Sequence, residues 1–158
     1  CIAPISSLAG AGDETSAAFK LAQITSIKIK WGVKIPLRDG VHLNATIFTP
    51  SNQTERLPVI VIVTPYVSDG YHDTAKYFAE HGYVFAIVDC RGRGNSEGEF
   101  QKFKTDGPDG YDAIEWLARQ PYADGNVAMW GGSYSGMNQW SIAAMHPPSL
   151  KTIIPASP

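Results

Sequence analysis

The stretch Asn126–Gly136, with the sequence NVAMWGGSYSG, decides the fold. A short apolar strand over 126–130 runs into two glycines and a serine, and a helix is predicted to begin directly afterwards. A strand, a sharp turn and a helix in this order are typical of a nucleophile elbow, in which Ser133 stands clear of its own backbone. Gly131 lets the helix turn back against the strand, and the amide of Tyr134 points toward a developing oxyanion.

The motif departs from the usual G-x-S-x-G pattern at one position. Glycine is expected two residues after the serine, where this chain has Ser135, and Gly136 follows one residue later. The alternative interpretation is an ordinary serine in a glycine-rich connection. The strand before Ser133 and the helix predicted over 134–145 favour the elbow.

Buried strands alternate with helices before and after this motif. The continuous apolar runs Pro58–Val63 and Tyr83–Val88 predict strands that are covered on both faces. Helices are predicted over Asp73–His81 and Asp109–Gln120, and a further short strand over Lys151–Pro155. Strands and helices in this order form βαβ units around a parallel sheet.

Two segments with alternating apolar residues precede the first buried run. They cover 27–35 and 41–47, and the turn Asp39-Gly40 lies between them. This pattern predicts two half-buried strands in an antiparallel hairpin that extends one edge of the sheet. The expected fold is therefore an open α/β fold. Four tryptophans are expected in its core or against its sheet: Trp31, Trp116, Trp130 and Trp140.

The composition favours a single globular domain. The chain has 158 residues, of which 44% are apolar and 18% charged, with a net charge of −2. This balance does not favour binding to nucleic acids or anionic membranes. Val127–Leu150 is the longest uncharged stretch, but glycines and polar residues interrupt it, so no membrane span is predicted. Two cysteines do not make a disulfide framework or a four-ligand zinc site, and we expect no metal or cofactor.

Residues 1–23 form a separate region in this interpretation. Cys1–Ala11 carries no charge, and Ala9-Gly10-Ala11 has the A-x-A form of a signal-peptidase site. We expect the remnant of a cleaved signal peptide, a flexible arm, and export to the periplasm or the medium. A lipid-modified Cys1 and a segment without any targeting role are the alternatives.

A polar loop is predicted over Asp89–Gly107. No apolar helix begins at its glycines, so a dinucleotide site is not favoured. Cys90 follows a buried strand and is expected to be a buried, unreactive thiol. The loop's charged residues are expected to form salt bridges: Arg91, Arg93 and Glu97. Elsewhere, a solvated helix start is favoured over a metal site for three polar residues: Asp69, His72 and Asp73.

Taken together, these motifs resemble a known group of enzymes. The form G-x-S-Y-x-G at 131–136, DGPDGYDAIEW at 106–116 and DCRGRGNSEG at 89–98 are similar to blocks of the cocaine esterase/X-Pro dipeptidyl-peptidase group of serine hydrolases. This CocE/NonD group includes α-amino-acid ester hydrolases and some β-lactam acylases. The resemblance runs from about Lys30 to Pro158. It implies that residues 24–158 are the N-terminal part of an α/β-hydrolase domain, which in the group also has a helical cap and a C-terminal jelly roll.

The resemblance implies roles for three residues. Ser133 is the nucleophile, and the backbone N–H of Tyr134 is one oxyanion donor. The second donor in the group is a tyrosine hydroxyl in a Pro-Tyr dipeptide after an early strand, and Pro65-Tyr66 stands in that position. A phenol above the sheet edge can donate a hydrogen bond to a tetrahedral oxyanion. The alternative for Tyr66 is a tyrosine at the rim that only packs its ring.

The histidine and the acid of a catalytic triad follow the serine along the chain in α/β-hydrolases. After Ser133 the sequence has no Asp or Glu, and its one histidine, His146, stands at the end of the predicted helix. We expect His146 to interact with the helix C-terminus and the triad histidine and acid to lie beyond Pro158. We therefore expect residues 12–158 alone to be inactive and to self-associate through an uncovered sheet edge.

The sequence predicts a serine hydrolase that forms an acyl-enzyme on Ser133. The expected substrates are small-molecule esters or amides, X-Pro peptides among them. The alternative from a different class is a catalytically silent α/β module that binds a ligand or partner and retains Ser133 as a relic.

Overall fold

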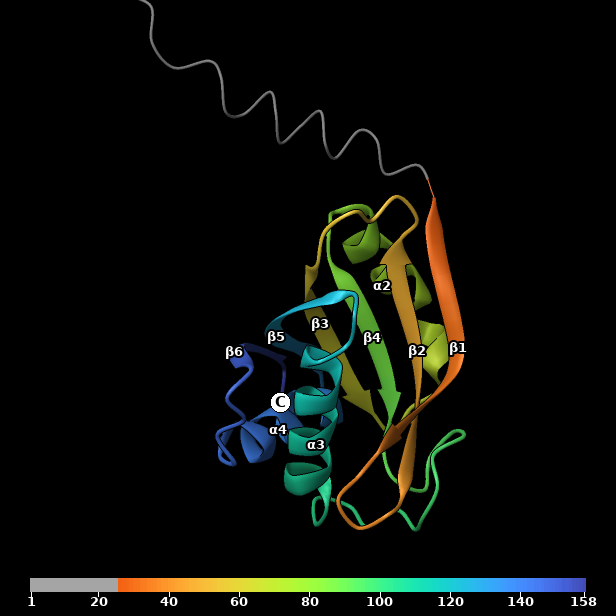
Figure 1. The fold of residues 1–158 in the computed structure, drawn as a ribbon. Helices are drawn as coiled ribbons and strands as arrows, with labels where there is room; N and C mark the ends of the chain where they lie inside the picture. Colours follow the sequence, from red (N-terminus) through yellow and green to blue (C-terminus); the bar gives the residue numbers. More distant parts are fainter. Residues whose placement is uncertain (1–25) are drawn as a thin grey trace, which may run out of the picture.

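The computed structural model describes residues 26–158, which form one six-stranded sheet with helices on both faces (Figure 1). The predictions made for residues 1–23 lie outside the described residues. No helix in the described part of the chain is long and apolar enough to cross a membrane. The elements in chain order are β1 (Ile27–Pro36), β2 (His42–Pro50), β3 (Leu57–Thr64), the 3-10 turn η1 (Ser68–Tyr71), α2 (His72–Glu80), β4 (Val84–Asp89), α3 (Asp106–Ala118), β5 (Ala123–Gly132), α4 (Tyr134–Ala143) and β6 (Leu150–Ala156).

The strands follow one another across the sheet in the order β1-β2-β4-β3-β5-β6. β1 pairs with β2, and β2 with β4, in antiparallel orientation. The remaining pairs, β3 with β4, β3 with β5 and β5 with β6, are parallel. The predicted parallel sheet with an antiparallel hairpin at one edge is therefore confirmed.

The core has two layers because β3 and β4 are covered on both faces. Figure 1 shows α3 and α4 on one side of the sheet and α2 on the other. Alternate residues of β3 and β4 pack toward these two sides. On the side of α3 and α4 the two strands contribute Val59, Val61, Val63, Val84, Ala86 and Val88. On the side of α2 they contribute Ile60, Ile62, Phe85 and Ile87. This arrangement explains the two continuous apolar runs in the sequence.

α3 begins at Asp106, three residues before the predicted start at Asp109. Asp106 and Gly107 were expected to belong to the loop, and Pro108 was assigned to neither element. Proline fits the first turn of a helix, where its missing N–H is not needed. A side chain at Gly107 would approach the carbonyl oxygen of Ser141 in α4 to 3.2 Å, so the absence of one lets the two helices pack closely.

The prediction of core or sheet packing is wrong for Trp140 and holds for Trp31 only through a contact with the sheet. Trp116 and Trp130 are partly buried against the core, as expected. Trp31 and Trp140 are 58% and 56% exposed. Trp31 lies on the edge strand β1, most of whose residues are exposed rather than half-buried, and it packs edge-on against Phe48. Trp140 lies on the outer face of α4, which no described element covers.

Candidate active site

Ser133 occupies the turn between β5 and α4 in an unusual backbone conformation. Its φ is 53° and its ψ is −125°, a region that residues with side chains rarely adopt. Its N–H donates to the carbonyl oxygen of Ala156 in β6 at 3.0 Å, and its own carbonyl oxygen accepts the N–H groups of Gly136 and Met137 at 2.9 Å. The predicted strand, turn and helix are therefore confirmed, with the serine at the strained position.

Gly131 allows the close approach of β5 and α4. Its φ is +154°, and a Cβ at this position would lie 2.8 Å from Cβ of Ser135 and 3.0 Å from its carbonyl oxygen. Both groups belong to the first turn of α4, so a side chain at Gly131 would push the helix away from the strand. The requirement for glycine before the serine therefore has a direct steric cause.

We expect Gly131→Ala to lower the free energy of unfolding by about 1–3 kcal/mol, through backbone strain and overpacking. Urea unfolding of the full-length protein measures this loss. Gly70→Ala is the matched control, because a Cβ at Gly70 would meet no atom within 4 Å. Equal stability of the two variants would contradict the steric role of Gly131.

Tyr66 lies beside Ser133, although the two residues are far apart in the sequence. It follows Pro65 after the end of β3, and its N–H donates to Oγ1 of Thr64 at 3.1 Å. Its hydroxyl lies 3.2 Å from Oγ of Ser133. The adjacent strands β3 and β5 lead to α2 and α4, which lie on opposite faces of the sheet. In open α/β sheets, ligands bind in the crevice at the carboxyl ends of such a pair of strands.

Tyr134, the third predicted site residue, is the first residue of α4. The N–H groups in the first turn of a helix have no acceptor within the helix, and the helix dipole makes this end positive. The backbone of Tyr134 therefore offers a donor next to Ser133. Its side chain is buried, and its hydroxyl donates to Oδ2 of Asp106 at 2.8 Å. Asp106 carries no sequence signal of its own for a role at the site.

A hollow of about 550 Å³ lies beside Tyr66. Its walls come from the loops after β3 and β4, from the middle of β1 and from the first half of β2. They include both apolar and polar groups: Trp31, Val67, Asn44, Asp89, Arg93 and Asn95. Its volume is in the range of small-molecule sites. Tyr66, whose hydroxyl lies 3.2 Å from Oγ of Ser133, therefore lines a hollow of that size.

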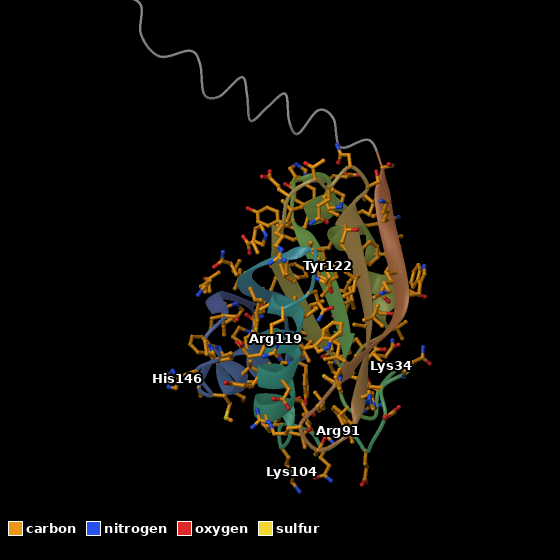
Figure 2. The ribbon with its side chains drawn as sticks, viewed as in Figure 1. Lys34, Arg91, Lys104, Arg119, Tyr122 and His146 are labelled. Carbon is orange, nitrogen blue, oxygen red and sulfur yellow. The ribbon has the colours of Figure 1, made fainter. Side chains whose placement is uncertain are left out.

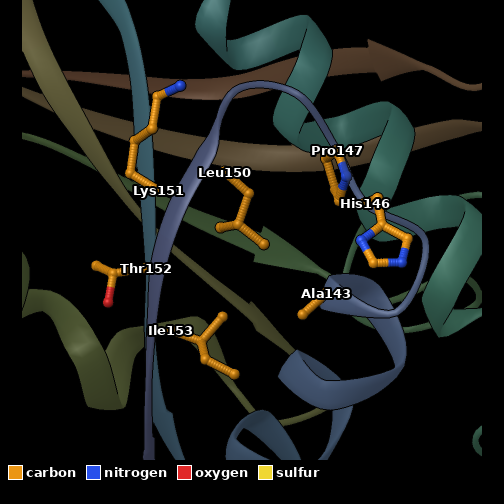
Figure 3. Close-up of a pocket in the computed structure, with 7 residues that line it drawn as sticks. All are labelled: Ala143, His146, Pro147, Leu150, Lys151, Thr152 and Ile153. Carbon is orange, nitrogen blue, oxygen red and sulfur yellow. The ribbon is translucent and has the colours of Figure 1, made fainter.

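His146 lies far from Ser133, as the sequence predicted. It follows the C-terminal end of α4, whereas Ser133 precedes the first residue of that helix. A ten-residue helix is about 15 Å long. Figure 2 shows His146 at the outer surface of the molecule. In Figure 3 it borders a hollow of about 320 Å³ between α4 and β6, together with Leu150 and Ile153.

Of the three residues expected to form salt bridges in the loop after β4, Arg91 does so clearly and Arg93 forms none among the described residues. Arg91, labelled in Figure 2, pairs with Asp39 at 2.8 Å and with Asp109 at 2.7 Å. Glu97 pairs with His42 at 3.1 Å, while Arg93 lies over the ring of Phe100 instead. Cys90 is buried, and its burial raises the pKa of the thiol, so the prediction of a buried thiol is confirmed.

Comparison with known proteins identifies the family of this chain. The family model of the X-Pro dipeptidyl-peptidase (S15) family matches residues 39–158. The cocaine esterase of Rhodococcus sp. is 35% identical over 130 residues, which are 78% of this chain and 22% of that protein. The crystal structure of a CocE/NonD family hydrolase from Staphylococcus aureus matches with a TM-score of 0.74 and 26% identity, over 80% of this chain and 27% of that one.

An α-amino acid ester hydrolase structure also matches, with a TM-score of 0.72 and 26% identity, over 84% of this chain and 26% of that one. The chain thus spans about a quarter of the length of these relatives. The family model covers β2 to β6, with Ser133 and Tyr66 among its matched residues, and on this basis the chain belongs to the X-Pro dipeptidyl-peptidase (S15) family.

Proposed function

We propose that this chain carries the nucleophile and the oxyanion donors of a serine hydrolase that cleaves ester or amide bonds. Ser133 is the nucleophile, and the backbone N–H of Tyr134 and the hydroxyl of Tyr66 are the donors. The observation that carries the proposal is the 3.2 Å distance between the Tyr66 hydroxyl and Oγ of Ser133. A donor that touches the nucleophile before the reaction lies within reach of the oxygen of a carbonyl group under attack.

The proposed reaction has two steps. A general base, which we place outside residues 26–158, removes the proton from Oγ of Ser133 as this oxygen attacks the substrate carbonyl carbon. The carbonyl oxygen becomes an oxyanion between Tyr66 and Tyr134. When the intermediate collapses, the bond to the alcohol or amine breaks, and the leaving group takes the proton from the base. Water then attacks the acyl-enzyme in the same way, which releases the acid and restores Ser133.

We propose small-molecule esters as the first substrates to test, with amides and X-Pro peptides next. The relatives named as cocaine esterase and α-amino acid ester hydrolase support esters. The family description supports X-Pro peptides. An ester is also the easier test substrate, because an alcohol or phenol leaves more readily than an amine.

Covalent labelling tests the proposal. The full-length protein is incubated with a fluorophosphonate, which phosphonylates activated serines, and the labelled peptide is identified by mass spectrometry. We expect label on Ser133 and none on that peptide in Ser133→Ala. If folded protein remains unlabelled at Ser133, the proposed function is wrong and the silent binding module is favoured instead.

A further inference from the structure

The side chain of Tyr134 points away from the proposed reaction and into the protein interior. Its hydroxyl donates to Oδ2 of Asp106 at 2.8 Å. Asp106 is the first residue of α3 and only 5% exposed. The hydrogen bond thus joins the first turn of α3 to the first turn of α4, the helix whose N-terminus faces the proposed oxyanion.

The loop before α3 closes over the same tyrosine. The backbone N–H of Phe103 donates to the Tyr134 hydroxyl oxygen at 3.1 Å. The rings of Phe103 and Tyr134 are stacked, with centroids 4.6 Å apart and an interplanar angle of 12°. Phe103 has a φ of 61°, a conformation that costs free energy in a residue with a side chain. The Tyr134 hydroxyl is therefore both donor and acceptor, and its ring is fixed by stacking.

Burial of the Asp106 carboxylate, which accepts the hydrogen bond from the Tyr134 hydroxyl, costs free energy because the charge loses its contact with water. Burial raises the pKa of Asp106, the hydrogen bond from Tyr134 acts in the opposite direction, and the nearby Asp109 raises it again. The adjacent cation Arg91 pairs with Asp109. Within residues 26–158, no lysine, arginine or histidine forms a salt bridge with Asp106. A buried carboxylate without a salt bridge depends on its hydrogen bonds, and the one from the Tyr134 hydroxyl is charge-assisted and directional.

We propose that Asp106 is a positioning residue, which acts through the Tyr134 hydroxyl to hold the Tyr134 backbone N–H toward the oxyanion. The inference rests on the proposed function. Two anchors flank this N–H. On one side, the N–H of Ser133 is bound to Ala156 in β6. On the other side, Asp106 holds the hydroxyl end of the Tyr134 ring. This contact fixes the rotation of the Tyr134 side chain about its Cα–Cβ bond. An oxyanion donor is effective only when its direction is fixed before the reaction.

Steady-state kinetics with an activated aryl ester test the inference in the full-length protein. The variants are Tyr134→Phe, Asp106→Ala and the double variant. We expect each single change to lower kcat about 10-fold with KM within about twofold, because small misplacements of catalytic groups affect mainly the chemical step. If Asp106 acts only through the Tyr134 hydroxyl, the double variant loses no more than the worse single variant.

Asp109→Ala is the matched control for loss of a buried carboxylate. Asp109 is also 5% exposed and lies in the same helical turn, but it pairs with Arg91 instead of Tyr134. We expect this variant to have a lower Tm and an unchanged kcat per folded molecule.

Three outcomes would overturn the inference. One is an unchanged kcat in Tyr134→Phe and Asp106→Ala. Another is a double variant whose loss is the product of the single losses. The third is a loss of kcat in Asp109→Ala equal to that in Asp106→Ala. Fluorophosphonate labelling of the wild-type protein tests the proposed function separately. If Ser133 is labelled, the proposed function stands, and any of the three outcomes then rejects only the role of Asp106.

Discussion

Ser133→Ala is expected to lower kcat for an activated aryl ester by about 10⁴-fold or more in the full-length protein, since the acyl-enzyme then has no oxygen on which to form. The Tyr66 hydroxyl and the Tyr134 N–H remain in this variant and sustain only a small residual rate. Release of the phenol measures turnover, and circular dichroism shows whether the variant is folded. Turnover within tenfold of the wild-type rate would contradict the assignment of Ser133.

Ser135→Ala is the matched control for this experiment. Ser135 is two residues from Ser133, only 1% exposed, and its hydroxyl has no hydrogen-bond partner in the described part of the chain. A buried hydroxyl without a partner costs free energy, so its removal should leave stability equal or higher. We expect wild-type kcat in Ser135→Ala. This result would attribute the loss of kcat in Ser133→Ala to the Ser133 hydroxyl alone.

The sequence predicted the sheet well because its strands carry an unambiguous signal. β3 and β4 are apolar at every position of their central parts, since they are covered by helices on both faces. The hairpin of β1 and β2 was recognised from its alternation and its turn. The exposure of β1 was not predicted, because alternation shows that one face is more apolar and does not show whether another element covers that face.

The start of α3 was placed too late because Gly107 and Pro108 are poor helix formers in isolation. In the structure, Gly107 lies against α4 and Pro108 occupies the first turn, where proline is tolerated. Tertiary packing therefore overrides the local preference at this helix end.

The sequence motif singled out Ser133 and Tyr134, and the family resemblance singled out Tyr66, but neither gave the geometry of the candidate site. The motif around Ser133 and the Pro-Tyr dipeptide at Tyr66 were each recognised from the sequence. Their contact depends on the parallel pairing of β3 with β5, in which Val59 lies opposite Val127. Neither strand's own pattern specifies this partner. The contact of Asp106 with Tyr134 likewise depends on the packing of α3 against α4, and so this residue escaped the sequence analysis.

Tyr66→Phe is expected to lower kcat by about 10²–10³-fold with little change in KM, which is the effect of removing one oxyanion donor. The hydroxyl that this change removes is the one 3.2 Å from Oγ of Ser133. Tyr66 is 47% exposed, so loss of the hydroxyl leaves no buried group unpaired and should leave the Tm unchanged. A fall in kcat at constant KM and Tm identifies a group whose interaction forms mainly in the transition state.

Tyr77→Phe is the matched control for Tyr66→Phe, because Tyr77 is also an exposed tyrosine but lies on α2, where its ring packs against Phe78 and His81. We expect wild-type kcat and KM in this control. A loss smaller than about threefold in Tyr66→Phe is far below the effect of an oxyanion donor. That result would reject the donor role and favour a rim tyrosine that only packs its ring, with the Tyr134 N–H and a group outside residues 26–158 left to stabilise the oxyanion.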